Sequence, residues 1–75
     1  MQTFILEKIE EIAFSTVQAT EELWESRILD SITIVELATE LEDEYNIEIP
    51  FEEIITDNFG TVEKMELYLN SKINP

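Results

Sequence analysis

The sequence contains no cysteine and no histidine, and these two absences exclude several kinds of active site. Without cysteine there is no disulfide and no thiolate metal site, and without histidine there is no Ser-His-Asp triad and no zinc site of ordinary ligands. A serine in this chain therefore has no imidazole base of its own to activate it. We expect no catalytic residue and no metal site, and any thioester chemistry needs a thiol imported on a cofactor.

Positive charge is also scarce, because 4 Lys and Arg residues stand against 18 Asp and Glu, for a formal net charge of −14. No Lys or Arg lies between Ile28 and Glu63. Nucleic acids and anionic membranes are bound by basic surfaces, so we expect the chain to bind neither. The concentrated negative charge repels itself, which favours a partner that supplies the positive charge.

Long apolar runs are missing as well. No segment approaches the length of a membrane-spanning helix and no signal-peptide pattern is visible, so we expect no membrane insertion and a cytoplasmic location. The chain can nevertheless fold, because 44% of its residues are hydrophobic and 9% are aromatic. Residues 1–75 make one domain, of a size at which a single core is only marginally stabilising.

The clearest helical pattern runs from Ile34 to Tyr45. Apolar residues follow one stripe of a 3.6-residue period at Ile34, Leu37, Ala38, Leu41 and Tyr45. Asp30 and Ser31 come just before this stripe, where short oxygen side chains accept hydrogen bonds from the first N–H groups of a helix. Taken alone, this pair is most simply a helix cap. The same helix start also favours an anion, through its N–H groups and its dipole.

The remaining segments complete an all-α prediction. A first helix begins at a Thr3 cap and closes against the core through Phe14, and its inward stripe consists of Ile5, Leu6, Ile9, Ile12 and Ala13. A long loop follows over residues 15–30, with a helical turn at 21–24 and anchors at Leu23, Trp24, Ile28 and Leu29.

The second half of the chain predicts a short helix and a last helix. Residues 51–55 form a short helical or turn segment packed through Phe51 and Ile54, and residues 57–60 form a turn. Thr61 caps a last helix that reaches about Ser71, with inward residues Val62, Met65, Tyr68 and Leu69. The chain end at Pro75 is expected to fray. We therefore expect a small four-helix bundle with three main helices, one short helix and a long first loop.

A second face of the 34–45 helix lies beside Ser31 and off the core stripe. Ile32, Val35 and Thr39 follow it at i, i+3 and i+7, and apolar residues there either pack under the preceding loop or form an exposed docking patch. Acidic residues stand around them without any cation. We expect partner recognition by this face, through Ile32, Val35, Glu36, Thr39, Glu42 and Asp43.

The ordered set of motifs in the middle of the chain resembles the acyl carrier protein family. The motifs are Leu29-Asp30-Ser31-Ile32, Val35-Glu36-Leu37, Leu41-Glu42-Asp43-Glu44-Tyr45 and Ile47-Glu48-Ile49-Pro50. The resemblance implies that Ser31, with Asp30 as its motif neighbour, carries 4′-phosphopantetheine through a phosphodiester. It also implies that acyl groups are held on the terminal thiol of that cofactor.

The chain departs from the fatty-acid carriers of that family in three places. It has no Gly just before the Asp-Ser pair, Thr33 stands where an acidic residue is frequent, and residues 57–61 lengthen a loop. In these places the chain looks closer to carriers of D-alanine or of specialised pathways, such as secondary metabolite biosynthesis. They leave the cargo open, whether fatty acyl, D-alanyl, another aminoacyl group or polyketide.

The resemblance implies a monomeric, non-catalytic single carrier domain. Its implied partners are a phosphopantetheinyl transferase, a cargo-loading ligase or synthase, and downstream acyl-transfer enzymes with basic docking surfaces. One alternative is an acidic interaction module, for example a DNA mimic without a prosthetic group. That alternative explains the net charge but not the order of the motifs. The other alternative, an enzyme in its own right, is disfavoured by the missing bases.

Overall fold

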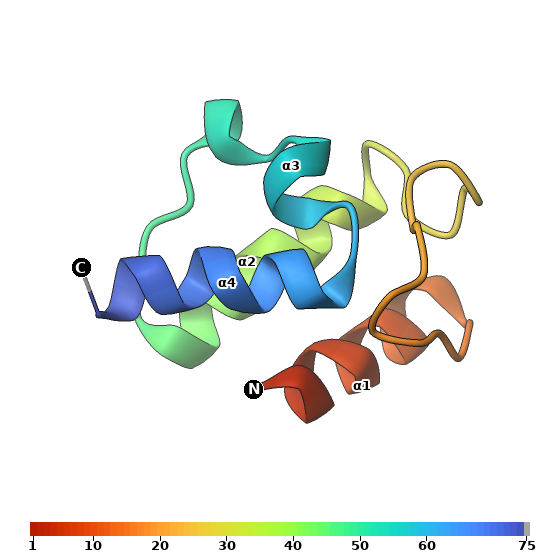
Figure 1. The fold of residues 1–75 in the computed structure, drawn as a ribbon, viewed down its shortest axis with the longest axis horizontal. Helices are drawn as coiled ribbons and strands as arrows, with labels where there is room; N and C mark the ends of the chain where they lie inside the picture. Colours follow the sequence, from red (N-terminus) through yellow and green to blue (C-terminus); the bar gives the residue numbers. More distant parts are fainter. Residues whose placement is uncertain (75) are drawn as a thin grey trace.

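The computed structural model describes residues 1–74, which contain helices and no strand (Figure 1). The elements are α1 (Gln2–Ala13), α2 (Thr33–Tyr45), the 3-10 helix η1 (Phe51–Glu53), α3 (Thr56–Phe59) and α4 (Val62–Ile73). The all-α prediction is therefore confirmed, with three main helices and a long first loop. The expectation for Pro75 lies outside the described residues.

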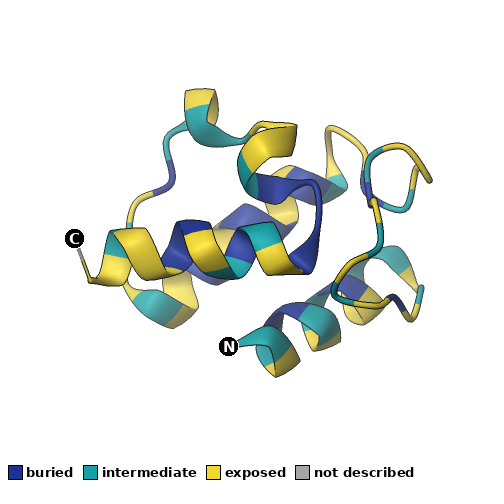
Figure 2. Ribbon diagram, in the orientation of Figure 1, coloured by how far each residue is buried: buried dark blue, intermediate teal, exposed yellow. Residues whose placement is uncertain are grey.

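The core lies where α1, α2 and α4 face one another. Helix α1 packs against both α2 and α4, and Figure 2 shows the buried positions on the facing sides of these helices. The predicted stripes are confirmed, because the buried residues of the three helices are Ile5, Ile9, Ile34, Leu37, Ala38, Leu41, Val62, Met65, Tyr68 and Leu69. The other predicted stripe residues, Leu6, Ile12, Ala13 and Tyr45, are only partly buried but pack against this core. Local periodicity therefore determines which face of each long helix turns inward.

The long first loop has no helix of its own but is anchored by side chains and backbone. Leu23 and Leu29 are buried, and Trp24 and Ile28 pack against the core. The Trp24 indole N–H donates to the Phe59 carbonyl at 2.9 Å, which ties the loop to α3. The predicted anchors are confirmed, whereas the helical turn predicted at residues 21–24 is absent and a turn occupies residues 23–27 instead.

Two predictions about α1 are wrong. Thr3 does not cap the helix, because α1 begins at Gln2 and Thr3 lies within it. Phe14 does not close the helix against the core, because its side chain is 90% exposed. The reason is its backbone: Phe14 ends α1 in the left-handed conformation, with φ 55° and ψ 33°, a conformation that reverses the chain after the last helical turn.

The short elements also differ from the prediction. Helix α3 occupies residues 56–59, where the sequence predicts a turn, because this turn of helix buries Phe59 against the Tyr68 ring at a centroid distance of 5.2 Å. The preceding η1 covers 51–53, and Phe51 is 78% exposed instead of packed. Ile54 packs against the core as predicted. Helix α4 is capped by Thr61 as predicted and runs on to Ile73.

Candidate functional site

The start of α2 is held by a reciprocal cap between Asp30 and Thr33. The Asp30 Oδ1 accepts hydrogen bonds from the N–H groups of Ile32 and Thr33, both at 2.9 Å. In return, the Asp30 N–H donates to the Thr33 hydroxyl oxygen at 2.8 Å. This is the geometry of a capping box, with Thr in place of Glu or Gln at the third position. The cap confirms Asp30 as a helix-start residue and fixes the backbone on both sides of Ser31.

Thr33 is a site residue that the sequence interpretation missed. In the sequence, Thr33 stands out only as a departure from a family pattern, although the spacing Asp-x-x-Thr is itself typical of a capping pair. The hydrogen bonds from the Thr33 N–H and hydroxyl, and then the bond from the Ile32 N–H, lower the pKa of the Asp30 carboxyl below its ordinary value. Asp30 is therefore ionised throughout the neutral range.

Ser31 lies inside this cap and is exposed. The other serine hydroxyls of the chain are engaged, because those of Ser15, Ser26 and Ser71 each donate to a backbone carbonyl. The Ser31 hydroxyl has no hydrogen-bond partner among residues 1–74. Among the described residues it is therefore the serine hydroxyl that is free of an internal hydrogen bond.

The start of α2 has fewer free N–H groups to bind an anion than the sequence predicts. The N–H groups of Ile32 and Thr33 are already bonded to the Asp30 carboxylate, and the Ile34 N–H donates to the Asp30 carbonyl at 2.9 Å. Those three donors are therefore not free to bind a phosphate. The partial positive charge of the helix dipole is set against the negative charge of Asp30. A group held at Ser31 would have to be attached covalently rather than bound by these N–H groups.

An apolar hollow of about 360 Å³ lies beside Ser31. Residues from the long loop, α2 and the η1 segment line it: Trp24, Leu29, Asp30, Ser31, Ile34, Val35, Phe51 and Ile54. Phe51 and Ile54 belong to a segment that the sequence interpretation did not connect with Ser31. Only the fold brings them there, since they follow Ser31 by some twenty residues in the chain.

The apolar residues predicted to recognise partners are exposed around this hollow. Ile32 is 69% exposed and Val35 is 41% exposed, so they do not pack under the preceding loop. Phe51, which lines the hollow, adds exposed apolar surface beyond the predicted set. The Thr39 hydroxyl donates to the Val35 carbonyl at 3.0 Å, which directs it onto its own helix.

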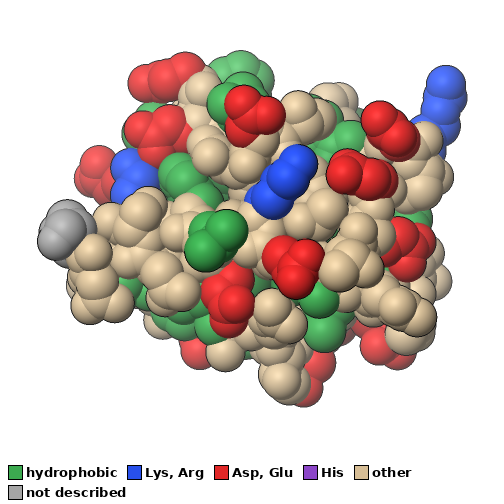
Figure 3. Space-filling model, in the orientation of Figure 1, with side chains coloured by type: hydrophobic (Ala, Val, Ile, Leu, Met, Phe, Trp, Pro, Cys, Tyr) green, Lys and Arg blue, Asp and Glu red, His purple; other side chains and the backbone are tan. Residues whose placement is uncertain are grey.

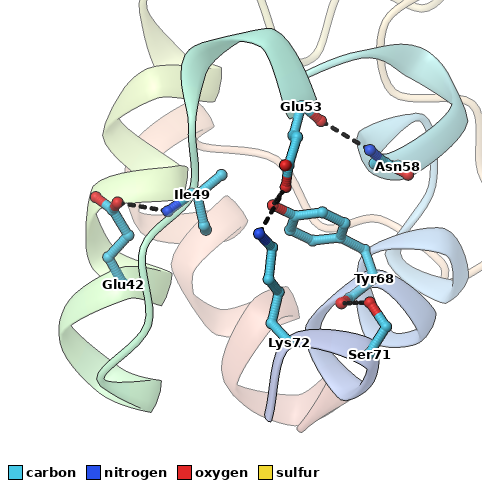
Figure 4. Close-up of polar contacts among 7 residues, drawn as sticks. All are labelled: Glu42, Ile49, Glu53, Asn58, Tyr68, Ser71 and Lys72. Carbon is cyan, nitrogen blue, oxygen red and sulfur yellow. Dashed lines mark hydrogen bonds and ion pairs between the residues drawn. The ribbon is translucent and has the colours of Figure 1, made fainter. Parts of the chain in front are cut away.

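The acidic residues of α2 fall into two groups. Glu36 and Asp43 are exposed. Glu42 is half-buried, and its carboxylate accepts a hydrogen bond from the Ile49 N–H at 2.7 Å, so it holds the segment after α2 (Figure 4). Glu42 therefore has a structural contact in addition to the recognition role predicted for it.

Cations from the ends of the chain reach part of the acidic surface. Lys8 of α1 contacts Glu40 of α2 at 3.5 Å, and Lys72 of α4 contacts Glu53 of η1 at 2.8 Å. Most carboxylates still lack such a partner among residues 1–74, and Figure 3 shows Asp and Glu spread over one face with few Lys or Arg between them. The fold thus offsets only part of the charge.

Two kinds of site are absent from residues 1–74. No three His, Cys, Asp or Glu residues gather there in a group that could hold a metal ion. Within the same residues, no helix is both long and apolar enough to span a membrane.

The sequence of this chain matches a known protein family and several named proteins. A family model described as "Phosphopantetheine attachment site" matches residues 29–69, more than half of the chain. The chain is 42% identical over 45 residues to proteins named D-alanyl carrier protein from Streptococcus pyogenes, among them those of serotype M1 and of serotype M5 (strain Manfredo). Each match covers 60% of this chain and 57% of the relative, so the chain spans somewhat more than half the length of these relatives.

Proposed function

The chain belongs to the family of phosphopantetheine-attachment carrier domains, and from this membership we propose that Ser31 is the residue that carries the 4′-phosphopantetheine arm. The observation that carries the proposal is the state of its hydroxyl, which is exposed and unbonded within residues 1–74, at a capped helix start inside the matched region. When attached, the arm supplies a terminal thiol that holds an acyl or aminoacyl group as a thioester.

The residues around Ser31 fit a covalently attached arm. Asp30 and Thr33 fix the backbone on both sides of Ser31, and the Ser31 hydroxyl bonds to no acceptor among residues 1–74. The apolar hollow alongside would offer the carbon chain of an attached arm a surface away from water.

The chain itself does not perform the attachment. No carboxylate or other base accepts a hydrogen bond from the Ser31 hydroxyl among the described residues, and the sequence has no histidine. The neighbouring Asp30 carboxylate is occupied by N–H groups and by the Thr33 hydroxyl. The deprotonation of Ser31 therefore falls to a phosphopantetheinyl transferase, as expected for a non-catalytic carrier.

We further propose that the cargo is a small aminoacyl group, with D-alanyl the first candidate. The support is the name of the relatives, D-alanyl carrier protein, together with two departures from fatty-acid carriers, the missing Gly just before the Asp-Ser pair and the presence of Thr33. A cargo-loading ligase and acyl-transfer enzymes with basic docking surfaces complete the proposed partners. The proposed setting is a monomer in the cytoplasm.

Recognition by these partners is assigned to the exposed collar around Ser31. Ile32 and Val35 form its apolar centre, and Glu36 and Asp43 form an acidic rim. Central apolar anchors carry most of the binding energy, so Ile32→Ala or Val35→Ala weakens docking by roughly 1 kcal/mol or more. Rim charges act mainly on association rate, so Glu36→Lys with Asp43→Lys slows loading chiefly at low salt.

A matched control for that charge reversal lies on α1. Glu7→Lys with Glu10→Lys changes the net charge by the same amount but alters exposed residues of a different helix. We expect this control to load at close to the wild-type rate. Equal loading rates for the α2 and α1 variants, with both folded, would contradict the assigned recognition surface.

The attachment itself is tested by mass spectrometry after incubation with a phosphopantetheinyl transferase and coenzyme A. We expect the wild-type protein and Ser26→Ala to gain one phosphopantetheine group and Ser31→Ala to gain none. Ser26 is a suitable control because it is exposed and near Ser31 in the chain, yet its hydroxyl donates to the Glu22 carbonyl. Loading of a folded Ser31→Ala variant would refute the proposal, and the family match disfavours the alternative of an acidic module without a cofactor.

A further inference from the structure

The segment that walls the hollow opposite α2 has little packing of its own. None of the three η1 residues is buried, and Phe51 and Glu52 are exposed. Burial is what holds most short elements in place, so a segment without it needs directional contacts to keep a fixed position. Its flanking residues are better placed, because Ile49 is buried and Ile54 packs against the core.

The directional contacts of η1 with α3 and α4 converge on one residue, Glu53, two of them on its carboxylate and one on its backbone carbonyl. Figure 4 shows the Glu53 carboxylate reaching from η1 towards two side chains of α4. The Tyr68 hydroxyl donates to Glu53 Oε1 at 2.5 Å, and Lys72 Nζ contacts the same oxygen at 2.8 Å. The Asn58 side-chain amide of α3 donates to the Glu53 carbonyl at 2.9 Å. Three contacts from two helices thus meet at one residue of η1.

Glu53 and Tyr68 have the protonation states that these contacts require. The hydrogen bond from Lys72, followed by the one from Tyr68, lowers the pKa of the Glu53 carboxyl, so it stays charged. Burial, followed by the contact with Glu53, raises the pKa of Tyr68, so its hydroxyl keeps the proton that it donates. Charge-assisted hydrogen bonds of this kind are stronger than those between neutral groups.

We infer that Glu53 is a positioning residue, which through Tyr68 and Lys72 fixes the Phe51–Ile54 wall of the hollow beside Ser31. Glu53 lies one position before Ile54 and two after Phe51, and both of these residues line the hollow. Helix α4, which does not itself line the hollow, thereby controls its width. That the hollow matters for a group on Ser31 rests on the proposed function. That Glu53 fixes the Phe51–Ile54 wall does not depend on that function.

The chain contains a built-in reporter for the wall. Trp24 is the only tryptophan, it is half-buried, and it lines the same hollow. Acrylamide is neutral, so its quenching of Trp24 fluorescence measures access to the hollow without interference from the net charge. The measurement uses the full chain without prosthetic group, so it is independent of whether Ser31 is the attachment site.

The test compares Glu53→Ala with Glu52→Ala, two changes of equal charge on the same 3-10 helix. Loss of an ion pair of this exposure shifts a local equilibrium by about two- to fivefold. We expect the quenching constant to rise for Glu53→Ala and to stay at the wild-type value for Glu52→Ala, whose side chain has no ion-pair partner within residues 1–74. Glu53→Gln keeps an acceptor oxygen and should recover part of the protection, which general destabilisation would not predict.

A second pair of variants keeps the test valid if Glu53→Ala does not fold. Tyr68→Phe removes only the hydroxyl that bonds to Glu53, and Tyr45→Phe removes the hydroxyl of the other tyrosine. We expect increased quenching for Tyr68→Phe alone, with both variants folded by circular dichroism. Quenching constants that do not differ within either pair would overturn the proposal. Failure of Ser31 loading would leave these results unaffected and would count against the proposed function only.

Discussion

The net charge of −14 leads to a strong prediction for stability as a function of salt. The fold measures 30 × 24 × 19 Å, so at 0.01 M salt the Debye length of about 30 Å spans the whole molecule. At 0.1 M salt the Debye length is about 10 Å, and charges on opposite sides no longer interact. Because the unfolded chain is larger, with a radius near 25 Å, it suffers less repulsion at either salt concentration. Added salt therefore favours the folded state.

The size of the effect follows from Coulomb's law. We treat the net charge as spread over a sphere, of about 14 Å radius for the folded chain and about 25 Å for the unfolded chain. The free energy of unfolding then rises by about 3 kcal/mol between 0.01 M and 0.1 M salt. For a domain of this length, 1 kcal/mol shifts the melting temperature by about 4–8 °C, so a rise of about 12–24 °C is expected. The contacts of Lys8 with Glu40 and of Lys72 with Glu53 reduce this value somewhat, since they already offset some repulsion.

Thermal melts by circular dichroism in sodium chloride from about 0.01 M to about 0.5 M measure the effect. The midpoint should rise steeply at first and then level off as screening saturates. The double variant Glu7→Lys with Glu10→Lys changes the net charge from −14 to −10, since each reversal adds two charges. Repulsion scales with the square of the net charge, so the rise of the melting midpoint with salt should be about half as large in the double variant as in the wild-type protein. A flat midpoint, or equal increments for both proteins, would refute the electrostatic argument.

Three further outcomes are expected from single residues. Thr33→Val should raise the pKa of Asp30 back towards its ordinary value in an NMR titration, and an unchanged pKa would contradict the cap. Because the folded-state pKa of Asp30 lies below its unfolded value, the cap stabilises the fold above about pH 4 and loses its effect as pH falls through the folded pKa. Leu69→Ala should lower the free energy of unfolding by about 2–5 kcal/mol in urea titrations. Leu67→Ala, two residues away but 71% exposed, should change it by less than about 0.5 kcal/mol, and comparable losses would contradict the assigned core. Thr61→Ala removes the oxygen that accepts a hydrogen bond from the Lys64 N–H, so it should lower the free energy of unfolding by about 1 kcal/mol in the same titrations. An unaltered free energy of unfolding would contradict the cap of α4.

The long helices could be predicted because their information is local. The stripe through Leu37 and Leu41 and the cap at Thr61 each depend on residues within a few positions of one another. The same holds for the helix start at Asp30, where cap and helix lie next to each other in the sequence. Ser31 was identified from its place in an ordered motif, which the family match over residues 29–69 supports.

The short elements could not be predicted because their causes lie far away in the chain. Helix α3 forms where Phe59 meets the Tyr68 ring, nine residues later, and η1 is held by contacts from α4. The exposure of Phe51 follows from that arrangement and has no signature in its neighbours. The hollow beside Ser31 likewise combines Trp24 with Ile54, which only the assembled fold brings to one place.

The central claim is that the arm is attached at Ser31 and nowhere else. Peptide mapping by tandem mass spectrometry, on protein loaded by a phosphopantetheinyl transferase from coenzyme A, tests it at the level of the single residue. We predict that every modified fragment contains Ser31 and that fragment ions assign the group to its side chain. Modification of Ser26 or of any other residue, or a loaded fragment that lacks Ser31, would contradict the claim.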